Sequence, residues 1–428
     1  MTRPCDLSAA LAAAAIVRGE LTSAELVRSC LDRIAERDPA VRAWAFLDPA
    51  LAMAQARACD DGPVRGPLHG VPVGIKDMID TGDMPTQYNS PLYSGFRPAR
   101  DAACVSILRS AGAVILGKLD TVEFASHGRT AATANPHDTT RTPGGSSSGS
   151  GAAVGDGQVP VALGTQTGGS VIRPASFCGA HAMKPSYGLI STEGTKVYSQ
   201  SLDTIGFFGR SAADLTLTAR ALGVIDSAAA PPDPGALRIG VFRGPHWDRA
   251  APETVSAIER AAQALAGAGA ALADVQGPQV FDALTDAQDV IMHWEGRGAY
   301  RAEYLGRYAD LHPKFRDEVE NTKGRSHDDV RRAANLIARG TMAFDDAFAG
   351  YDAWLTPSVI GEAPVGLLST GEAIFNRMWT AMHGPCITLP AATGPNGLPV
   401  GVQIVAPRLA DAALLAVAEA VAPVVGAR

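Results

Sequence analysis

Apolar positions near the amino terminus recur at helical spacing. Thr22 and Glu25 fit a capping box, and the apolar side chains that follow up to Pro39 keep the helical period: Val27, Cys30, Leu31 and Ile34. A second helix is predicted over residues 48–59. An amphipathic helix is also predicted in the alanine-rich stretch of the first 20 residues, so the amino-terminal part of the chain is expected to be helical.

The apolar pattern changes its period at residues 66–77, GPLHGVPVGIKD. After two glycine-containing turns, alternation predicts a strand that ends at Lys76 and contains Val71, Val73 and Ile75. Residues 101–118, DAACVSILRSAGAVILGK, have the pattern of a helix, a glycine turn and a short apolar strand. This succession predicts an α/β unit of the kind that builds a layered sheet.

The second half of the chain begins after a proline- and alanine-rich connector, SAAAPPDPGA, at 227–236. A strand, LRIGVF, and a helix from about Pro252 to Ala271 are predicted next, followed by a charged and aromatic helical stretch over 280–350. The tail returns to an α/β pattern with WLTP, GPCITLPAATGPNGLPVGVQIVAP and a closing helix. Strands on both sides of the helical stretch predict one sheet that the tail completes.

Composition limits the classes of partner and compartment. With 428 residues, 46% apolar composition and a net charge of −7, the chain is expected to be globular and not to bind nucleic acid. No apolar span approaches the roughly 20 residues of a membrane helix, so we expect no membrane partner and a cytoplasmic location; a signal peptide is the alternative for the first residues. The cysteines lack C-x-x-C pairs, which argues against disulfides and a zinc site: Cys5, Cys30, Cys59, Cys104, Cys178 and Cys386.

Two segments rich in glycine and serine lie close together, GGSSSGSG at 144–151 and GTQTGGS at 164–170. A flexible linker is disfavoured, because the small and apolar residues that follow belong in a packed interior. A P-loop needs a lysine after its glycines, and no lysine lies between 119 and 183. The elbow motif G-x-S-x-G matches around Ser147, but a loop with two prolines precedes it where a strand is required.

A serine activated without histidine needs a base that is neutral near pH 7, which lysine can be and arginine cannot. Of 37 basic residues only six are lysines: Lys76, Lys118, Lys184, Lys196, Lys314 and Lys323. Lys76 is the best placed, because an apolar strand buries its stem and loss of water lowers its pKa. The alternative is that Lys76 stays charged, with its ammonium group either reaching solvent at the end of the strand or pairing with Asp77.

Several motifs together resemble the amidase signature hydrolases. They are GPLHGVPVGIKD, GKLDTVEFA, NPHDTTRTPGGSSSGSGAAV, LGTQTGGSVIRPASFCG, MKPSYGLIS, SLDTIGFFGRSAADL, YDAWLTP and GLPVGVQIVAP. The resemblance is dense from about 66 to 220 and recognisable in the tail. It implies an α/β/α layered fold, with a large mixed, twisted central sheet covered by helices on both faces, and chemistry that uses no cofactor and no metal.

The resemblance also implies a catalytic triad of Lys76, Ser146 and Ser170. Ser170, the last serine of TQTGGS, matches the family's nucleophile, and Ser146, 24 residues earlier, matches the bridging serine, which the family holds in a cis peptide. Backbone N–H groups of residues Thr167, Gly168, Gly169 and Ser170 are expected to form the oxyanion hole, since glycines there leave the N–H groups unobstructed. The other loop serines are expected to have structural roles.

Some positions depart from the family's pattern or need a separate interpretation. Gln166 stands where many relatives have Asp, so an amide must re-form any hydrogen bond the carboxylate made, and Ala125 is expected to line the substrate pocket. Arg173 is expected to have a structural hydrogen-bonding role. Cys178 is expected to be a small buried thiol that packs in the interior. His127, His137 and His181 are expected to lie in loops or in the core.

We expect one amidase-signature domain over 1–428. Within it we expect N-terminal helices over 1–60, a catalytic core over 66–220, a variable, mostly helical cleft region over 237–350, and C-terminal α/β completion over 351–428. In the cleft region four aromatic side chains are expected either to contact substrate or, somewhat preferred, to pack: Trp294, Tyr300, Tyr304 and Phe315.

The function implied is hydrolysis of the C–N bond of carboxamides through an acyl-enzyme on Ser170. Carbamates (urethanes) and esters are further substrates of this chemistry, because the relay and the oxyanion hole require only a polarised acyl carbon. The expected partner is a small amide or carbamate substrate. The sequence leaves open whether the chain forms a homodimer. The alternatives are the glutaminase subunit of a tRNA-dependent amidotransferase and a non-catalytic binding protein on the same scaffold.

Overall fold

Short apolar segments between turns form the strands of the computed structural model, which describes residues 3–426. Their bounds are β1 (Trp44–Leu47), β2 (Pro72–Lys76), β3 (Val114–Leu119), β4 (Val161–Gln166), β5 (His181–Lys184), β6 (Thr204–Gly209), β7 (Arg238–Val241), β8 (Ala271–Asp274), β9 (Ala353–Pro357), β10 (Cys386–Thr393) and β11 (Pro399–Val405). All belong to one sheet with the order β1-β3-β2-β4-β6-β5-β10-β11-β9-β7-β8.

The sheet is mixed, as the resemblance implies. β2 pairs in parallel with both β3 and β4, and β7 pairs in parallel with β8 and β9. The strands between these two groups pair antiparallel. The late strands β10 and β11 lie between β5 and β9, so the tail joins the two halves of the sheet, which confirms the expected late completion.

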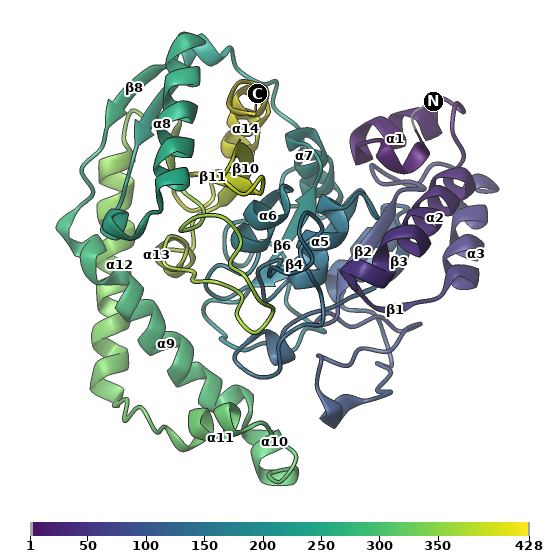
Figure 1. Ribbon diagram of the computed structural model, residues 1–428, viewed down its shortest axis with the longest axis horizontal. Coiled ribbons are helices and arrows are strands. Elements are labelled where there is room, and N and C mark those ends of the chain that lie inside the picture. The colour runs from purple at the N-terminus through teal and green to yellow at the C-terminus, as the bar shows by residue number, and fades with distance from the viewer. Residues whose placement is uncertain (1–2, 427–428) are drawn as a thin grey trace.

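Helices cover both faces of the sheet (Figure 1). One face packs against α4 (Ala103–Ser110), α7 (Ala212–Ala221), α8 (Pro252–Gly267) and α14 (Asp411–Val425). The other packs against α2 (Ser23–Val41), α3 (Pro49–Asp60), α5 (Ser148–Gly155) and α6 (Ile172–Cys178). Alternation along β2 directs Ile75 to the first face and Lys76 to the second, where α5 and α6 lie.

The remaining helices lie at the edges of this core. α1 (Ala9–Val17) packs beside α7, and α13 (Arg377–Ala381) contacts α9 (Leu284–Ala299). In Figure 1, α9, α10 (Arg301–Gly306) and α11 (Pro313–Glu320) extend away from the sheet, and α12 (His327–Phe348) runs back towards it. The stretch expected to be helical over 280–350 is therefore helical. Within residues 3–426, none of the helices combines the length and the apolar character needed to cross a membrane.

Two predicted helix ends were wrong. The helix expected up to Pro39 continues to Val41, because a proline in the last turn removes only one hydrogen bond and the buried Val41 still packs on the core. The helix expected to reach Ala271 ends at Gly267. Gly269 takes a positive φ of +94° and turns the chain, and Ala271 begins β8.

Candidate active site

Lys76 lies where the neighbouring parallel strands β2 and β4 end at the same edge of the sheet. Its side chain is fully buried, and its Nζ lies 2.7 Å from Oγ1 of Thr165, 2.8 Å from Oγ of Ser146 and 3.0 Å from Oγ of Ser147. The Thr165 carbonyl oxygen is 3.4 Å away. The lysine expected to be the base is therefore surrounded by neutral oxygen atoms.

No carboxylate forms an ion pair with Lys76 among the described residues, so the alternative pairing with Asp77 is wrong. Asp77 instead lies 3.1 Å from Nζ of Lys118. Burial holds the pKa of the Lys76 amine well below its usual value, and the charge of Asp203 opposes this shift. Asp203 is itself buried, which raises its pKa to about 6, and it accepts hydrogen bonds from Thr167 Oγ1 at 2.5 Å and from the Tyr198 N–H.

Hydrogen bonds to its backbone fix the position of Ser146 in the loop before α5. The Gly145–Ser146 peptide bond is cis, as the resemblance implies. The Ser146 carbonyl accepts hydrogen bonds from the Val122 N–H and the Thr121 hydroxyl, at 3.2 and 3.0 Å. Arg173 donates to the Gly145 carbonyl at 2.6 Å, which is the structural hydrogen bonding expected of that arginine.

The other serines of this loop bond to backbone groups, as expected. Ser148 and Ser150 each donate a 2.8 Å hydrogen bond to a carbonyl. Ser147 is fully buried, accepts from the Thr165 N–H and donates to the Thr165 carbonyl, both at 3.2 Å. The residues immediately before it form a loop and not a strand, so the elbow motif lacks its required context. Its contact with Lys76 was not expected from the sequence.

Ser170 lies in the turn between β4 and α6 and faces a cleft of about 360 Å³, called here the Ser170 cleft. Ser146, Thr167, Gly168 and Gly169 line the same cleft, whereas Lys76 lies beneath it. Ser170 is 8% exposed, and no side chain among the described residues forms a hydrogen bond with its hydroxyl. The three residues expected to form the triad thus gather at one end of the sheet, with Lys76 and Ser146 in direct contact.

The backbone of residues 167–170 is oriented by hydrogen bonds to its carbonyl groups. In chain order these accept from the Gln288 side chain at 2.8 Å, the Thr380 hydroxyl at 2.7 Å, the Arg173 N–H at 3.0 Å and the Ser147 N–H at 3.3 Å. No partner among residues 3–426 occupies the N–H groups of Thr167, Gly168, Gly169 and Ser170. These N–H groups can therefore bind an oxygen atom in the Ser170 cleft.

Gln166 connects this turn to its surroundings through both ends of its amide. Its Oε1 accepts from the N–H groups of Val171 and Ile172 at 2.8 and 3.1 Å, at the start of α6. Its Nε2 donates to the Thr380 hydroxyl at 3.0 Å. The amide thus supplies acceptor bonds that a carboxylate could make and adds a donor that a carboxylate lacks.

The cleft wall contains residues that the sequence did not indicate. Ala125 lines the cleft, as expected, but so do Tyr198, Met292, His127 and Arg377. His127 lies in the loop after β3, in keeping with the expected loop or core position, and it also lines the cleft.

The aromatic side chains of the 280–350 stretch pack rather than line the cleft. Tyr300 and Phe315 are each 1% exposed and lie beside Phe124. Trp294 and Tyr304 are absent from the cleft wall. Cys178, His137 and His181 are also outside it, and the Cys178 thiol is buried as expected. In the part of the chain that the structure describes, no group of three His, Cys, Asp or Glu side chains is arranged to hold a metal ion.

Comparisons with known proteins agree on one family. The sequence pattern of the family called Amidase matches residues 25–415. The chain is 34% identical to a subunit of the glutamyl-tRNA(Gln) amidotransferase of Chloroflexus aggregans, over 98% of this chain and 96% of that protein. It is similar in structure to the peptide amidase of Stenotrophomonas maltophilia, with 28% identity, a TM-score of 0.83, and 99% and 98% of the two chains covered.

A third similarity is to a 6-aminohexanoate cyclic dimer hydrolase, with 25% identity, a TM-score of 0.87, and 99% and 98% of the two chains covered. These solved structures share the mixed sheet with helices on both faces. The chain therefore belongs to the amidase family, the signature hydrolases that its motifs resemble, and is an enzyme that hydrolyses carbon–nitrogen bonds.

Proposed function

We propose that the protein hydrolyses small carboxamides through an acyl-enzyme on Ser170, with Ser146 as proton relay and Lys76 as base. One observation carries this proposal: a fully buried lysine amine, which has no carboxylate partner within residues 3–426, lies 2.8 Å from the Ser146 hydroxyl, and that serine shares a cleft with Ser170. Burial favours the neutral amine, which is the form that accepts a proton.

The reaction begins when the oxygen of Ser170 attacks the carbonyl carbon of the amide. The Ser170 proton passes to Ser146, and the Ser146 proton passes to Nζ of Lys76. Negative charge then collects on the substrate oxygen, which the N–H groups of Thr167, Gly168, Gly169 and Ser170 stabilise.

Collapse of this intermediate breaks the C–N bond. The proton held by Lys76 returns through Ser146 to the departing nitrogen, which leaves as an amine or ammonia. Water then attacks the Ser170 ester, with its proton taken by the same relay, and the free acid is released. Carbamates and esters can react in the same way, because every step acts on the acyl carbon and its leaving atom.

Detection of the acyl-enzyme tests this proposal. Mixing the protein with an activated anilide should give a burst of one aniline per active site, and mass spectrometry should find the acyl group on the peptide that contains Ser170. Ser170→Ala should show neither the burst nor the acylated peptide. An acyl group on Ser147, or steady hydrolysis by Ser170→Ala, would contradict the proposal.

A second candidate function is favoured by the names of several relatives. Proteins about 34% identical over nearly the whole chain are named as subunits of glutamyl-tRNA(Gln) amidotransferase. A protein of this kind would release ammonia from glutamine for a partner. The purified chain alone should hydrolyse simple amides under the first proposal, whereas glutamine as the only substrate, hydrolysed only with added partner subunits, would favour the second.

A further inference from the structure

Arg377 lies at the boundary between the Ser170 cleft and a second cavity. It is the first residue of α13, and its aliphatic stem packs over the turn that holds Ser170, since a Cβ atom added to Gly168 would lie 3.7 Å from Arg377 Cγ. Arg377 lines both spaces, together with His127. A group on this boundary can contact a substrate whose scissile bond is at Ser170.

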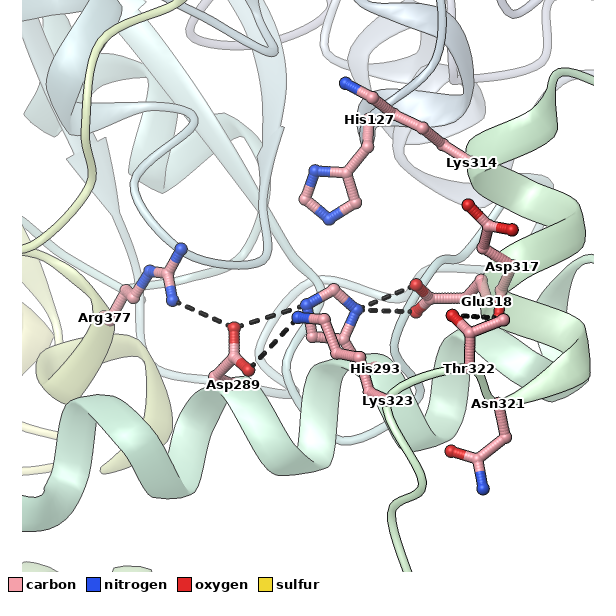
Figure 2. Close-up of a pocket in the computed structure, with 10 residues that line it drawn as sticks. All are labelled: His127, Asp289, His293, Lys314, Asp317, Glu318, Asn321, Thr322, Lys323 and Arg377. Atoms are coloured by element: carbon pink, nitrogen blue, oxygen red, sulfur yellow. Dashed lines mark hydrogen bonds and ion pairs between the residues drawn. The ribbon is translucent and has the colours of Figure 1, made fainter.

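The second cavity, called here the side cavity, has a volume of about 400 Å³ and is drawn in Figure 2. The carboxylate of Asp289 lies in its wall, close to nitrogen atoms of four other side chains. Nitrogens of Arg325, Arg377, His293 and Lys323 lie 3.0, 3.3, 3.3 and 3.5 Å from its carboxylate oxygens. One carboxylate thus lies within 3.5 Å of nitrogens from two arginines, a lysine and a histidine.

His293 lies between two carboxylates, 3.3 Å from Asp289 and 2.8 Å from Glu318. Burial lowers its pKa, but hydrogen bonds to Asp289 and Glu318 outweigh burial, so that its pKa is raised overall. His127, which stacks on His293, is different: burial, followed by the charge of His293, lowers its pKa to about 4. His127 is therefore neutral, and Arg377 is the cationic group on the shared boundary.

Arg377 uses little of its hydrogen-bonding capacity within the described structure. Its guanidinium has five N–H donors, and the 3.3 Å contact of Nη1 with Asp289 is its one polar side-chain contact among residues 3–426. Figure 2 shows one terminal nitrogen directed to Asp289 and the other turned away from it. Asp289 thus orients the guanidinium and leaves donors for a ligand.

The charges that line the Ser170 cleft are not balanced. Its charged residues are Arg173, Arg377 and Glu372. Glu372 pairs with Arg249 and Arg377 pairs with Asp289, which leaves the charge of Arg173 unbalanced. Arg173 is 6% exposed and has no carboxylate partner among residues 3–426, and its Nε has no hydrogen-bond partner at all. A buried guanidinium without a counter-charge is costly unless an anion binds nearby.

From these contacts, we propose that Arg377 binds the carboxylate of an anionic substrate, a small amide that carries a carboxylate group. This inference rests on the proposed function, because it places the amide carbonyl at Ser170. The guanidinium fork matches a carboxylate in shape and charge. A cationic amide would instead meet Arg173 and Arg377 in the same cleft.

The test compares initial rates of ammonia release, which do not count cleavage of an ester bond, from three amides of equal chain length: glutaramate, its uncharged methyl ester, and cationic 5-aminopentanamide. The wild type should prefer glutaramate in kcat/KM. Arg377→Met keeps the stem over Gly168 and removes the charge, and should lower kcat/KM for glutaramate about 10- to 100-fold, mainly through KM. Amide hydrolysis of the ester should change less than about twofold.

Arg325→Met is the matched control, because it removes another cation from Asp289 but lies outside the cleft wall. It should leave the order of the three substrates unchanged. Equal kcat/KM for glutaramate and its ester, a preference for the cationic amide, or equal losses for all three in Arg377→Met would overturn the inference.

Binding provides a readout that does not depend on turnover. Calorimetry with Ser170→Ala should detect glutaramate, and the double variant with Arg377→Met should lose this binding about 10- to 100-fold. Unchanged binding in the double variant contradicts the inference. Acylation of Ser170 by a neutral anilide separates the two proposals, since it tests the catalytic mechanism without any carboxylate.

Discussion

Lys76 carries a proton in the unfolded chain at neutral pH, whereas the folded protein surrounds its amine with neutral oxygen atoms and apolar atoms. Its usual pKa is 10.5, and burial lowers this value in the folded state. The same burial that activates the amine as a base therefore opposes folding, because the unfolded chain binds a proton that the folded protein releases.

This linkage predicts how stability depends on pH. Below the folded pKa of Lys76 the destabilisation is complete, and stability rises as pH increases from the folded pKa towards 10.5. Lys76→Met should remove that rise and lower activity at least about 10³-fold. Urea unfolding between pH 7 and 9.5 measures the slope. Lys314→Met, at an exposed position, should keep the wild-type slope. An unchanged slope in Lys76→Met would contradict the assignment of a neutral amine to Lys76.

The loop serines should differ in their effect on activity. Ser146→Ala should lower kcat about 10²- to 10⁴-fold, because it removes the relay. Ser147→Ala should keep kcat within about tenfold and lower stability by about 1 kcal/mol, because Ser147 mainly bonds to Thr165. Steady-state kinetics and urea unfolding of both variants check this order. The reverse order, with Ser147→Ala inactive, would indicate a different nucleophile or relay.

At the scale of elements, the candidate site depends on how β4 passes into α6. The end of β4 supplies Thr165 to Lys76, the following turn presents Ser170, and Gln166 binds the first N–H groups of α6. The sequence predicted strands and helices around these motifs because their apolar periods are clear. It did not predict that Thr380 of α13 would hold both Gln166 and Gly168, because that contact joins residues more than 200 positions apart.

Gln166→Leu should weaken this connection. The N–H groups of Val171 and Ile172 would lose their acceptor in a buried place, which should lower the free energy of unfolding by about 2–3 kcal/mol and reduce kcat. Gln166→Glu keeps the acceptor and loses the donor to Thr380, so it should lower the free energy of unfolding and kcat less than Gln166→Leu does. If Gln166→Leu matched the wild type in unfolding and in kcat, the amide would not organise the turn.

Gly169 is expected to be essential for a steric reason. A Cβ atom there would lie 2.4 Å from Oδ1 of Asn376 and 2.9 Å from Cβ of Ala373, so Gly169→Ala must displace either the turn that carries the candidate oxyanion N–H groups or the residues packed against it. We expect kcat to fall about 10²-fold or more. Gly267→Ala, where nothing lies within 4 Å, is the matched control and should not reduce kcat. Equal kcat values for the two variants would show that the turn is not constrained.

At the scale of the whole molecule, the last strands connect the two halves of the sheet. β10 pairs with β5 and β11 pairs with β9, so removal of the tail would separate β1–β6 from β7–β9. We propose that the chain is one domain. Urea unfolding followed by tryptophan fluorescence and by far-ultraviolet circular dichroism should then give coincident single transitions. Two separated transitions would show that the halves fold independently.

The whole molecule also shows what the sequence could not reveal. Lys76, Ser146 and Ser170 stand in motifs, so a resemblance can point to them. His127 and Arg377 stand outside the motifs. Asp203 stands in one, SLDTIGFFGRSAADL, but like them it contributes through contacts between distant segments, which leave no spacing pattern in one sequence. The strand order could not be read either, because apolar alternation identifies a strand but not its neighbour.

The most direct test of the central claim is the rate at which an uncharged fluorophosphonate reacts with the protein, measured against pH. We predict one modified residue, Ser170, and a rate that rises with pH as Lys76 loses its proton. Lys76→Met should lower that rate about 10³-fold and abolish the rise. Modification of another serine, or an equal rate and pH profile in Lys76→Met, would contradict a neutral Lys76 as the base that activates Ser170.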